Sequence, residues 1–441
     1  MKYRERLIDG ILEKNLDSPL ITVVTGPRQV GKTTTISRIL SKISENRVLI
    51  LNMDFSRTIK EIRNDEQWFE KQIAALTGIR IEDLKDKVYI FIDEAQKYPE
   101  IFPIIKILHD TYKGKVKIIL SGSSDLEIKQ KTAETLAGRT LTYHMHPFSI
   151  SEVICRDSGE RGSTVLSILD GDLSFGSLKE LELDRCADWK GEFPKIEEYA
   201  VQCLLPPVYS DVAPDEVNNW ILSYIDSYIE RDMRSLHEIG NIESYREVVI
   251  QFCQRIGSHL SFSSLARDAG INWLTCKKYI SYLKQSLMAY SLKPFFINIS
   301  KRVKKSPKMY MADNGISRAL SDFPSVEILK ASGKIGNYFE NLILNEFRKW
   351  NSVRTTPAQF YFWESTAVSQ VDLIIETEGK TIPVEIKYGN SFKTEYIRGI
   401  ETFKDSYSEK GLEIPFSLVV YNGPLTQVKP DIIAMPFWLL I

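Results

Sequence analysis

The sequence feature that most limits the possible folds is the eight-residue segment GPRQVGKT at positions 26–33. It matches the pattern G-x-x-x-x-G-K-[ST], and it lies between a predicted buried strand, LITVVTG at 20–26, and a predicted helix. Gly26 and Gly31 allow consecutive backbone N–H groups to turn toward one anion, because no Cβ stands in the way. The helix that begins near Lys32 adds the positive end of its dipole. The pattern therefore predicts a phosphate-binding loop.

The residue types in this loop indicate a nucleoside triphosphate as the ligand. Lys32 is expected to reach the β- and γ-phosphates, and the hydroxyl of Thr33 is expected to bind Mg²⁺. The sequence contains no N/TKxD-type guanine signature, which favours ATP. Arg28 either contacts the nucleotide or is solvated, and the motif does not decide between the two. The predicted nucleotide-binding residues of the loop are Gly26, Pro27, Arg28, Gln29, Val30, Gly31, Lys32, Thr33 and Thr34.

Residues 20–147 alternate predicted strands with predicted helices, which is typical of a parallel α/β sheet with helices on both faces. The predicted strands are short apolar runs at 20–26, 47–54, 87–94 and 115–122, and the segment RTLTYHMH at 139–146 is a candidate for a fifth strand.

Acidic and hydroxyl residues follow two of these strands. Asp93 and Glu94 end the run VYIFIDE, at the carboxyl end of a strand, where ligands bind in parallel sheets. Asp93 is expected to support Mg²⁺, and Glu94 to polarise the water that attacks the γ-phosphate. The alternative is a solvated strand end. Ser121 and Ser123 follow the next strand and either contact the γ-phosphate or mark an ordinary strand-to-turn transition.

Arg139, in the segment LAGR, has two open interpretations. One is a catalytic arginine finger, acting in cis or from a neighbouring subunit, which can supply a rate factor of about 10³–10⁵. The other is a structural ion pair.

Composition places these motifs in a soluble protein. At 441 residues the chain is long enough for roughly three domains. Its 57 basic and 58 acidic residues exclude a uniformly basic nucleic-acid coat but allow local basic patches. Five cysteines without a CxxC pair indicate reduced thiols and a cytoplasmic location. The longest apolar run, 432–441, is too short to cross a bilayer, so no membrane partner is expected.

The rest of the chain divides by pattern into three parts. Residues 148–244 are predicted to be a helical connecting region that contains a loop-rich insertion at 157–192 and a helix at 217–239. Residues 245–330 are predicted to be a winged helix-turn-helix. Residues 331–441 are predicted to be a small α+β domain.

The predicted winged helix carries basic residues that suggest a DNA-binding surface. Five of the eight residues in KRVKKSPK at 301–308 are basic, and Lys277 and Lys278 lie on the second helix of the motif. Such a surface could bind DNA phosphates. It could equally be a solvated face or a contact with a protein partner.

The last part contains a pattern of acidic residues and lysine on neighbouring strands. If 371–376 and 381–387 form a hairpin with its turn at 378–379, residue 376 pairs with 381, and Asp372 pairs with Glu385. Directly opposed residues have Cβ atoms about 4.5–5.5 Å apart. The two carboxylates would then bind a divalent metal with Lys387 beside them, or Lys387 would neutralise them structurally.

This arrangement resembles that of the PD-(D/E)xK nucleases, and the resemblance implies that Glu340, on the preceding helix, completes the site. It leaves open whether the domain cleaves nucleic acid or is an inactive relative.

The whole chain resembles the prokaryotic AAA-type P-loop ATPases that carry a C-terminal domain of unknown function, number 4143. The resemblance implies an AAA-type ATPase domain at residues 1–147, ATP and Mg²⁺ as cofactors, and probable ATP hydrolysis. The segments that carry it are GPRQVGKTT, FIDEAQKYPE, LSGSSD, LAGRTLTYHMHPFS, YIERDM, KSPKMYMAD, QVDLIIE and PVEIK.

The sequence therefore predicts an ATPase that couples nucleotide binding and hydrolysis to a winged-helix and nuclease-like module acting on nucleic acid. Two alternatives remain open. One is a nucleotide-gated module that binds a protein partner or associates with itself and contains an inactive nuclease-like domain. The other is an ATP-regulated, metal-dependent nuclease.

Overall fold

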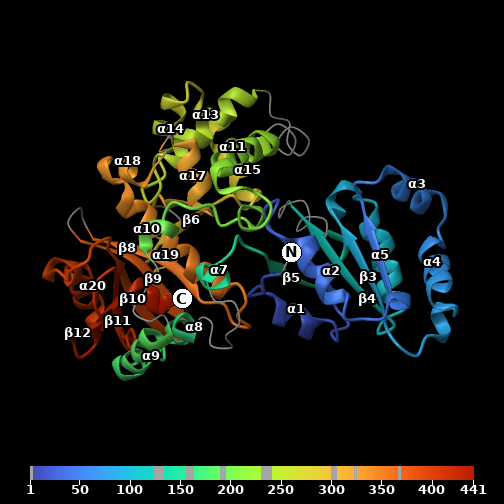
Figure 1. Ribbon diagram of the computed structural model, residues 1–441, viewed down its shortest axis with the longest axis horizontal. Helices are drawn as coiled ribbons and strands as arrows, with labels where there is room; N and C mark the ends of the chain where they lie inside the picture. Colours follow the sequence, from blue (N-terminus) through green and yellow to red (C-terminus); the bar gives the residue numbers. More distant parts are fainter. Residues whose placement is uncertain are drawn as a thin grey trace. The chain divides into compact units, whose positions relative to one another are not determined.

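A computed structural model describes residues 3–123, 134–154, 163–188, 195–229, 241–298, 305–321, 323, 325–365 and 369–441. The chain forms two compact units: an N-terminal unit at Lys2–Pro147, to which Gln285–Leu287 also belongs, and a C-terminal unit that contains Phe148–Lys284 and Met288–Ile441. Figure 1 draws the first from blue to teal and the second from green to red.

The N-terminal unit contains one five-stranded parallel sheet, as the alternating pattern predicted. Its strand order is β2-β3-β4-β1-β5, so β4 lies between β1 and β3. Each of the predicted strand segments contains one strand. The bounds are β1 Ile21–Thr25, β2 Val48–Asn52, β3 Val88–Asp93, β4 Val116–Gly122 and β5 Thr140–His144.

Helices cover this sheet because its strands are apolar on the sides that face them. Residues of β1, β3 and β4 form one buried cluster with Phe69 and Ile73 of α4 and with Ile105 of α5 (Figure 1). Helix α2 follows the phosphate loop, and Gly78 in the left-handed region ends α4. The helices are α1 Asp9–Asn15, α2 Lys32–Leu40, α3 Ser56–Asn64, α4 Trp68–Thr77 and α5 Ile101–Thr111.

The C-terminal unit is built on an eight-stranded sheet with the order β12-β13-β11-β10-β9-β8-β6-β7. Strand β6 pairs with β8 in parallel, with Lys293 opposite Tyr361 and Pro294 opposite Phe362. The strands are β6 Ala289–Pro294, β7 Lys308–Met311, β8 Gln359–Glu364, β9 Gln370–Thr377, β10 Lys380–Ile386, β11 Ser417–Tyr421, β12 Thr426–Lys429 and β13 Ile432–Pro436.

This pairing crosses the predicted domain boundary between residues 330 and 331. The sequence pattern predicts one domain at 245–330, which contains β6 and β7, and another at 331–441, which contains β8 to β13. The structure joins them in one sheet, because the backbone groups of β6 pair with β7 on one side and with β8 on the other.

The helices of the C-terminal unit surround this sheet and the segments before it. Helix α20 packs on β9 and β10, and Asn241 and Ser261 cap α13 and α14 with their side chains. The helices are α7 Ile150–Ile154, α8 Ser163–Leu169, α9 Phe175–Asp188, α10 Ile196–Tyr199, α11 Val217–Ser227, α13 Ile242–Cys253, α14 Phe262–Asp268, α15 Trp273–Gln285, α17 Asn314–Leu320, α18 Val326–Ala331, α19 Ile335–Asn351 and α20 Arg398–Tyr407.

The described part of the predicted insertion at 157–192, residues 163–188, is more helical than its composition predicted. It contains α8 and the 14-residue α9, where a loop-rich segment with weak helix was expected. Tertiary contacts support these helices: Arg354 Nη1 donates to Leu169 O at 3.0 Å, and Arg185 Nη1 donates to Trp438 O at 3.3 Å. Burial against the rest of the unit thus outweighs the low local helix propensity. Of the predicted helix at 217–239, residues 230–239 lie outside the described residues.

The first residues of the C-terminal unit are anchored to α19 by a buried ion pair. Lys349 Nζ lies 2.9 Å from Glu346 Oε1 and donates to Phe148 O at 2.7 Å. Glu346 Oε2 accepts a hydrogen bond from Ile150 N at 3.1 Å. Removing one partner would leave a buried charge uncompensated, so the start of this unit is held firmly.

None of the helices in the described ranges is both long and apolar enough to span a membrane.

Candidate functional site

The phosphate loop connects β1 to α2 through two backbone positions with positive φ. Gln29 has φ 62°, and Gly31, directly before α2, has φ 96°. Gly26 is needed for a different reason: a Cβ there would lie 2.3 Å from the carbonyl oxygen of Met145. The loop can therefore pass close to the chain that leaves β5 only with glycine at position 26.

The side chain of Lys32 folds back into this loop. Its residue is only 6% exposed, and Nζ donates to Gly26 O at 2.8 Å and to Pro27 O at 2.9 Å. Carbonyl groups thus hold the ammonium inside the loop, at the N-terminus of α2. This position combines a full positive charge with the helix dipole, and it suits an anionic phosphate group.

Thr33 and Asp93 meet at the carboxyl end of the sheet. Thr33 Oγ1 donates to Asp93 Oδ2 at 2.7 Å, and Ser121 Oγ donates to Asp93 Oδ1. Asp93 is 4% exposed. The neighbouring strands β3 and β4 and the start of α2 therefore place two hydroxyls and one carboxylate together. Oxygen ligands of this kind fit Mg²⁺, which prefers one or two protein ligands with water and substrate phosphates.

Glu94 is held beside this group in an unusual backbone conformation. It has φ 52° and ψ 42°, in the left-handed region, directly after β3. Gln96 Nε2 donates to Glu94 Oε2 at 2.6 Å, and Ser123 Oγ lies 3.4 Å from the same oxygen. A non-glycine residue in this region is costly and marks sites where geometry is constrained.

Two residues of this site were not predicted from the sequence. Gln96 orients the carboxylate of Glu94, and Arg6 fixes the loop: Arg6 Nη1 donates to Val30 O at 2.7 Å, and Nη2 donates to His146 O at 2.6 Å. The segment DEAQ offered a signal for Gln96, two positions after Glu94. Arg6 lies in a separate N-terminal segment, and no local pattern pointed to it.

The other predicted loop residues differ in exposure. Pro27 and Val30 are buried, Arg28 is half-buried, and Gln29 and Thr34 are exposed. Buried Val30 serves packing, and its carbonyl receives Arg6.

Arg139 lies away from the phosphate loop, which corrects its proposed role as a finger in cis. Its carbonyl accepts from Ile21 N, at the first residue of β1, whereas the loop follows Thr25 at the other end. Five strand residues separate the two ends by on the order of 15 Å. The guanidinium instead donates to both oxygens of Asp110, at 2.7 and 2.8 Å, and lowers the pKa of that carboxyl to about 2. This is the ion pair that the sequence left as the alternative.

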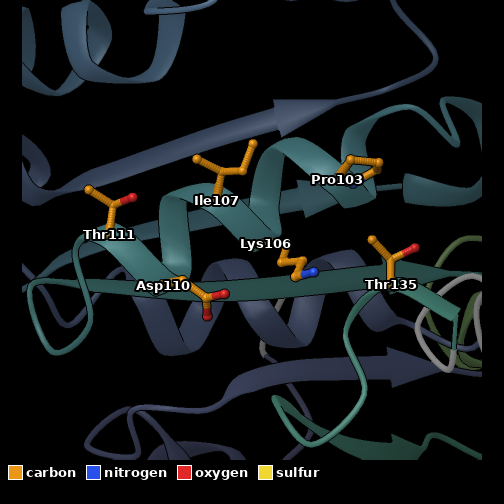
Figure 2. A pocket seen from close by; sticks show the side chains of 6 residues that line it. All are labelled: Pro103, Lys106, Ile107, Asp110, Thr111 and Thr135. Carbon is orange, nitrogen blue, oxygen red and sulfur yellow. The ribbon is translucent and has the colours of Figure 1, made fainter.

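A surface pocket of about 430 Å³ lies along α5 and does not include the phosphate loop (Figure 2). Asp110, which pairs with Arg139, is one of its lining residues. We assign it no part in nucleotide binding. Its lining is Pro103, Lys106, Ile107, Asp110, Thr111 and Thr135.

In the C-terminal unit, the structure confirms the predicted hairpin register. Glu378 and Gly379 form the turn with φ 44° and 85°, and Thr381 pairs with Glu376. Lys387 Nζ lies 3.1 Å from Asp372 Oδ2 and 2.6 Å from Glu385 Oε1. Asp372 also accepts from Ile386 N at 3.0 Å. The two carboxylates and the lysine therefore share one face of β9 and β10.

Glu340 joins this group from α19, together with two residues of β7 that were not predicted. Tyr310 OH donates to Glu340 Oε1 at 2.5 Å. Lys308 Nζ lies 3.6 Å from Glu340 Oε1 and 3.7 Å from Asp372 Oδ1. We call these six residues the carboxylate–lysine cluster: Lys308, Tyr310, Glu340, Asp372, Glu385 and Lys387.

The position of Lys308 corrects its predicted place on an exposed basic wing. Its residue is 4% exposed, because all of β7 is buried. Lys301, Arg302 and Lys304 lie outside the described residues. Lys305 is exposed, and so are Lys277 and Lys278 on α15.

Burial and mutual charge set the protonation of the cluster. Burial and the neighbouring charge of Asp372 raise the pKa of Glu385 to about 8. Burial also favours a raised pKa for Asp372, but Lys387 and Lys308 outweigh it and lower that pKa. Burial raises the pKa of Glu340. Burial therefore favours the protonated form of Glu385 at neutral pH.

The cluster does not fit a divalent metal as it stands. Among the residues that the structure describes, no three His, Cys, Asp or Glu side chains are arranged to hold a metal ion. The space between Glu340 and Asp372 faces the ammonium of Lys308. No step of a reaction is therefore assigned to a metal here.

Comparison with known proteins identifies the parts of the chain. Residues 18–154 match the family described as AAA domain. Residues 194–327 match a domain of unknown function, DUF8612, and residues 335–440 match another, DUF4143. The first of these agrees with a nucleotide-binding P-loop ATPase domain in the N-terminal unit.

Proteins of bacteria and of an archaeon are similar to most of this chain. An uncharacterized protein of Mycobacterium tuberculosis is 24% identical over 85% of this chain and 72% of its own length. One of Methanocaldococcus jannaschii is 22% identical over 99% and 91%, and one of Haemophilus influenzae is 20% identical over 78% of both. A solved structure, PCH-2 of C. elegans, matches 51% of this chain and 55% of its own, with 16% identity and a TM-score of 0.22, and supports no argument.

Proposed function

We propose that the N-terminal unit binds ATP with Mg²⁺ and hydrolyses it, with Glu94 as the base. The observation that carries this proposal is the meeting of Lys32, the Thr33–Asp93 pair and Glu94 at the carboxyl end of one parallel sheet. Ligands bind at this end in α/β sheets. The AAA domain match over the same residues supports it.

Each residue has a role in this proposal. The loop N–H groups and Lys32 bind the β- and γ-phosphates and stabilise the charge that develops on them. Thr33 and Asp93 would hold Mg²⁺, which when bound neutralises phosphate charge. Glu94, oriented by Gln96, accepts a proton from the water that attacks the γ-phosphate. Ser121 bonds Asp93, and Ser123 lies beside Glu94. Both serines therefore act by positioning these two carboxylates.

The experiment is an ATPase assay on the full chain and on Glu94→Gln. Turnover should be lost in this variant while nucleotide binding is retained, whereas Lys32→Ala should lose binding. Glu100→Gln is the matched control, because Glu100 is exposed and lies directly before α5. Equal turnover in Glu94→Gln and wild type would reject Glu94 as the base.

We propose further that the nucleotide state is passed to the C-terminal unit along residues 145–148. Within the N-terminal unit, Met145 N donates to Thr25 O at 2.7 Å, directly before the phosphate loop. Within the C-terminal unit, Phe148 O is held by Lys349. A shift of the loop on nucleotide binding would therefore act on α19 through very few residues.

We propose DNA as the partner of the C-terminal unit. Helices α13, α14 and α15 followed by strands β6 and β7 have the element order of a winged helix, and Lys277 and Lys278 are exposed on α15. Binding measured by gel shift should weaken steeply with added salt and in Lys277→Glu/Lys278→Glu. Stimulation of ATP turnover by DNA would favour this function. Its absence would favour the nucleotide-gated protein-interaction module.

A further inference from the structure

The ammonium of Lys308 lies where the carboxylates of the C-terminal unit converge. Glu340 comes from α19 and Asp372 from β9, and Lys308 Nζ is 3.6 and 3.7 Å from their nearest oxygens. On the other side of Asp372, Lys387 Nζ is 3.1 Å from Oδ2. Asp372 thus has a lysine at each of its two oxygens.

The fold fixes this ammonium rather than leaving it at the surface. Lys308 begins β7, and it pairs with Leu292 of β6 in an antiparallel register. Its Nζ also lies 5.5 Å from the centre of the Phe362 ring. A buried lysine that contacts carboxylates and an aromatic ring has little room to move away from them.

The two lysines of the cluster offset most of the charge of its carboxyls without an added cation. Lys308 and Lys387 supply two positive charges, and Glu340, Asp372 and Glu385 supply three carboxyls. Glu385 Oε2 is buried without a hydrogen-bond partner in the described part of the chain, which a neutral carboxyl tolerates better than a carboxylate does.

We propose that the Lys308 ammonium takes the place of a divalent cation between Glu340 and Asp372, so that the carboxylate–lysine cluster binds no metal ion. A cation held by these two carboxylates would lie against a fixed positive charge in a buried environment, where repulsion is strong. Removing the charge of Lys308 should therefore create a site for a hard divalent cation. This inference does not depend on ATP hydrolysis by the N-terminal unit.

The test is Mn²⁺ binding, measured by electron paramagnetic resonance on the full chain. All proteins carry Thr33→Val and Asp93→Asn, so that the predicted Mg²⁺ ligands of the phosphate loop do not contribute. In this background we expect no Mn²⁺ binding at the cluster. Adding Lys308→Met, which removes the charge and keeps an apolar stem, should tighten Mn²⁺ binding by at least about tenfold.

Two further variants make the result specific. Lys305→Met removes a neighbouring exposed lysine and should leave Mn²⁺ binding unchanged. Asp372→Asn added to Lys308→Met should abolish the gain. A folded Lys308→Met protein without the gain would overturn the proposal.

The background protein provides a second measurement that needs no Lys308 variant. Mn²⁺ binding by that protein, lost on Asp372→Asn, would show a metal site in the presence of Lys308 and overturn the proposal. Binding that is absent, or unchanged by Asp372→Asn, supports it even if Lys308→Met does not fold.

Discussion

Thr33 Oγ1 and Asp93 Oδ2 lie 2.7 Å apart, although 60 positions separate them in the sequence. Thr33 follows β1 and Asp93 ends β3, and β4 lies between these strands in the sheet. Ser121, on β4, bonds the other oxygen of Asp93. The strand order therefore places a hydroxyl of the intervening strand behind the acid, where it fixes the carboxylate that faces Thr33.

This relationship predicts the effect of Thr33→Val. Valine has nearly the same shape but lacks the hydroxyl that bonds Asp93 and would bind Mg²⁺. We expect the rate of ATP hydrolysis to fall by at least about a hundredfold. A Mg²⁺ titration of turnover checks this, and Thr111→Val is the control because Thr111 is exposed at the end of α5, outside the phosphate loop. Similar losses in both variants would contradict the specific role of Thr33.

The contact between Gln96 and Glu94 predicts a defect in turnover without a defect in binding. Gln96→Ala removes the 2.6 Å hydrogen bond that orients the carboxylate. We expect kcat to fall by about ten- to a hundredfold, because a misplaced Glu94 carboxylate is no longer well oriented toward the attacking water. Nucleotide affinity, measured by titration calorimetry, should change little because Gln96 does not belong to the phosphate loop. A large loss of affinity with unchanged kcat would contradict the positioning role.

The sequence was sufficient for the N-terminal sheet because its three inner strands, β1, β3 and β4, are short apolar runs that are buried. It was also sufficient for the hairpin of β9 and β10, because the turn Glu378–Gly379 fixes the register. It could not place Lys308. A lysine in a run with four other basic residues is typical of a solvated surface segment. Only the pairing of β7 with β6 brings Lys308 into the core.

The positions of Arg139 and of β6 likewise could not be predicted from local sequence patterns. The residues LAGR indicate that Arg139 follows a helical turn, but not at which end of the sheet it lies; the parallel pairing of β5 with β1 decides that. The sequence likewise suggested that β6 belongs to a separate domain. Its pairing with β8 depends on backbone groups, which leave no side-chain pattern.

The position of Arg139 predicts that Arg139→Ala retains ATP hydrolysis within about twofold, if no neighbouring subunit uses it. The ion pair with Asp110 is exposed, so its loss should affect little else. A contrary result would be informative. If turnover fell by about 10³ and returned on mixing with Glu94→Gln protein, Arg139 would act as a finger in trans. Asp110→Asn is the control, since it breaks the same ion pair and keeps the arginine.

The raised pKa of Glu385 predicts how the stability of the C-terminal unit depends on pH. Its pKa is raised from 4.5 to about 8 by burial and by Asp372. Between these values the folded state keeps a proton that the unfolded state has released, so the free energy of unfolding falls as pH rises through this window. Lys308 and Lys387, whose pKa values are raised, stay charged throughout, and the lowered pKa of Asp372 acts only at lower pH.

Glu385→Gln should therefore flatten this dependence, because glutamine does not titrate. The measurement is urea unfolding of the full chain at about pH 5 and about pH 8, with the tryptophan and tyrosine signals of the C-terminal unit as the readout. Wild type should lose stability toward pH 8, and the variant should lose less. Glu395→Gln is the control, since its side chain is 70% exposed and should leave the wild-type slope intact. An unchanged slope in Glu385→Gln would mean that Glu385 is ionised in the folded protein at neutral pH.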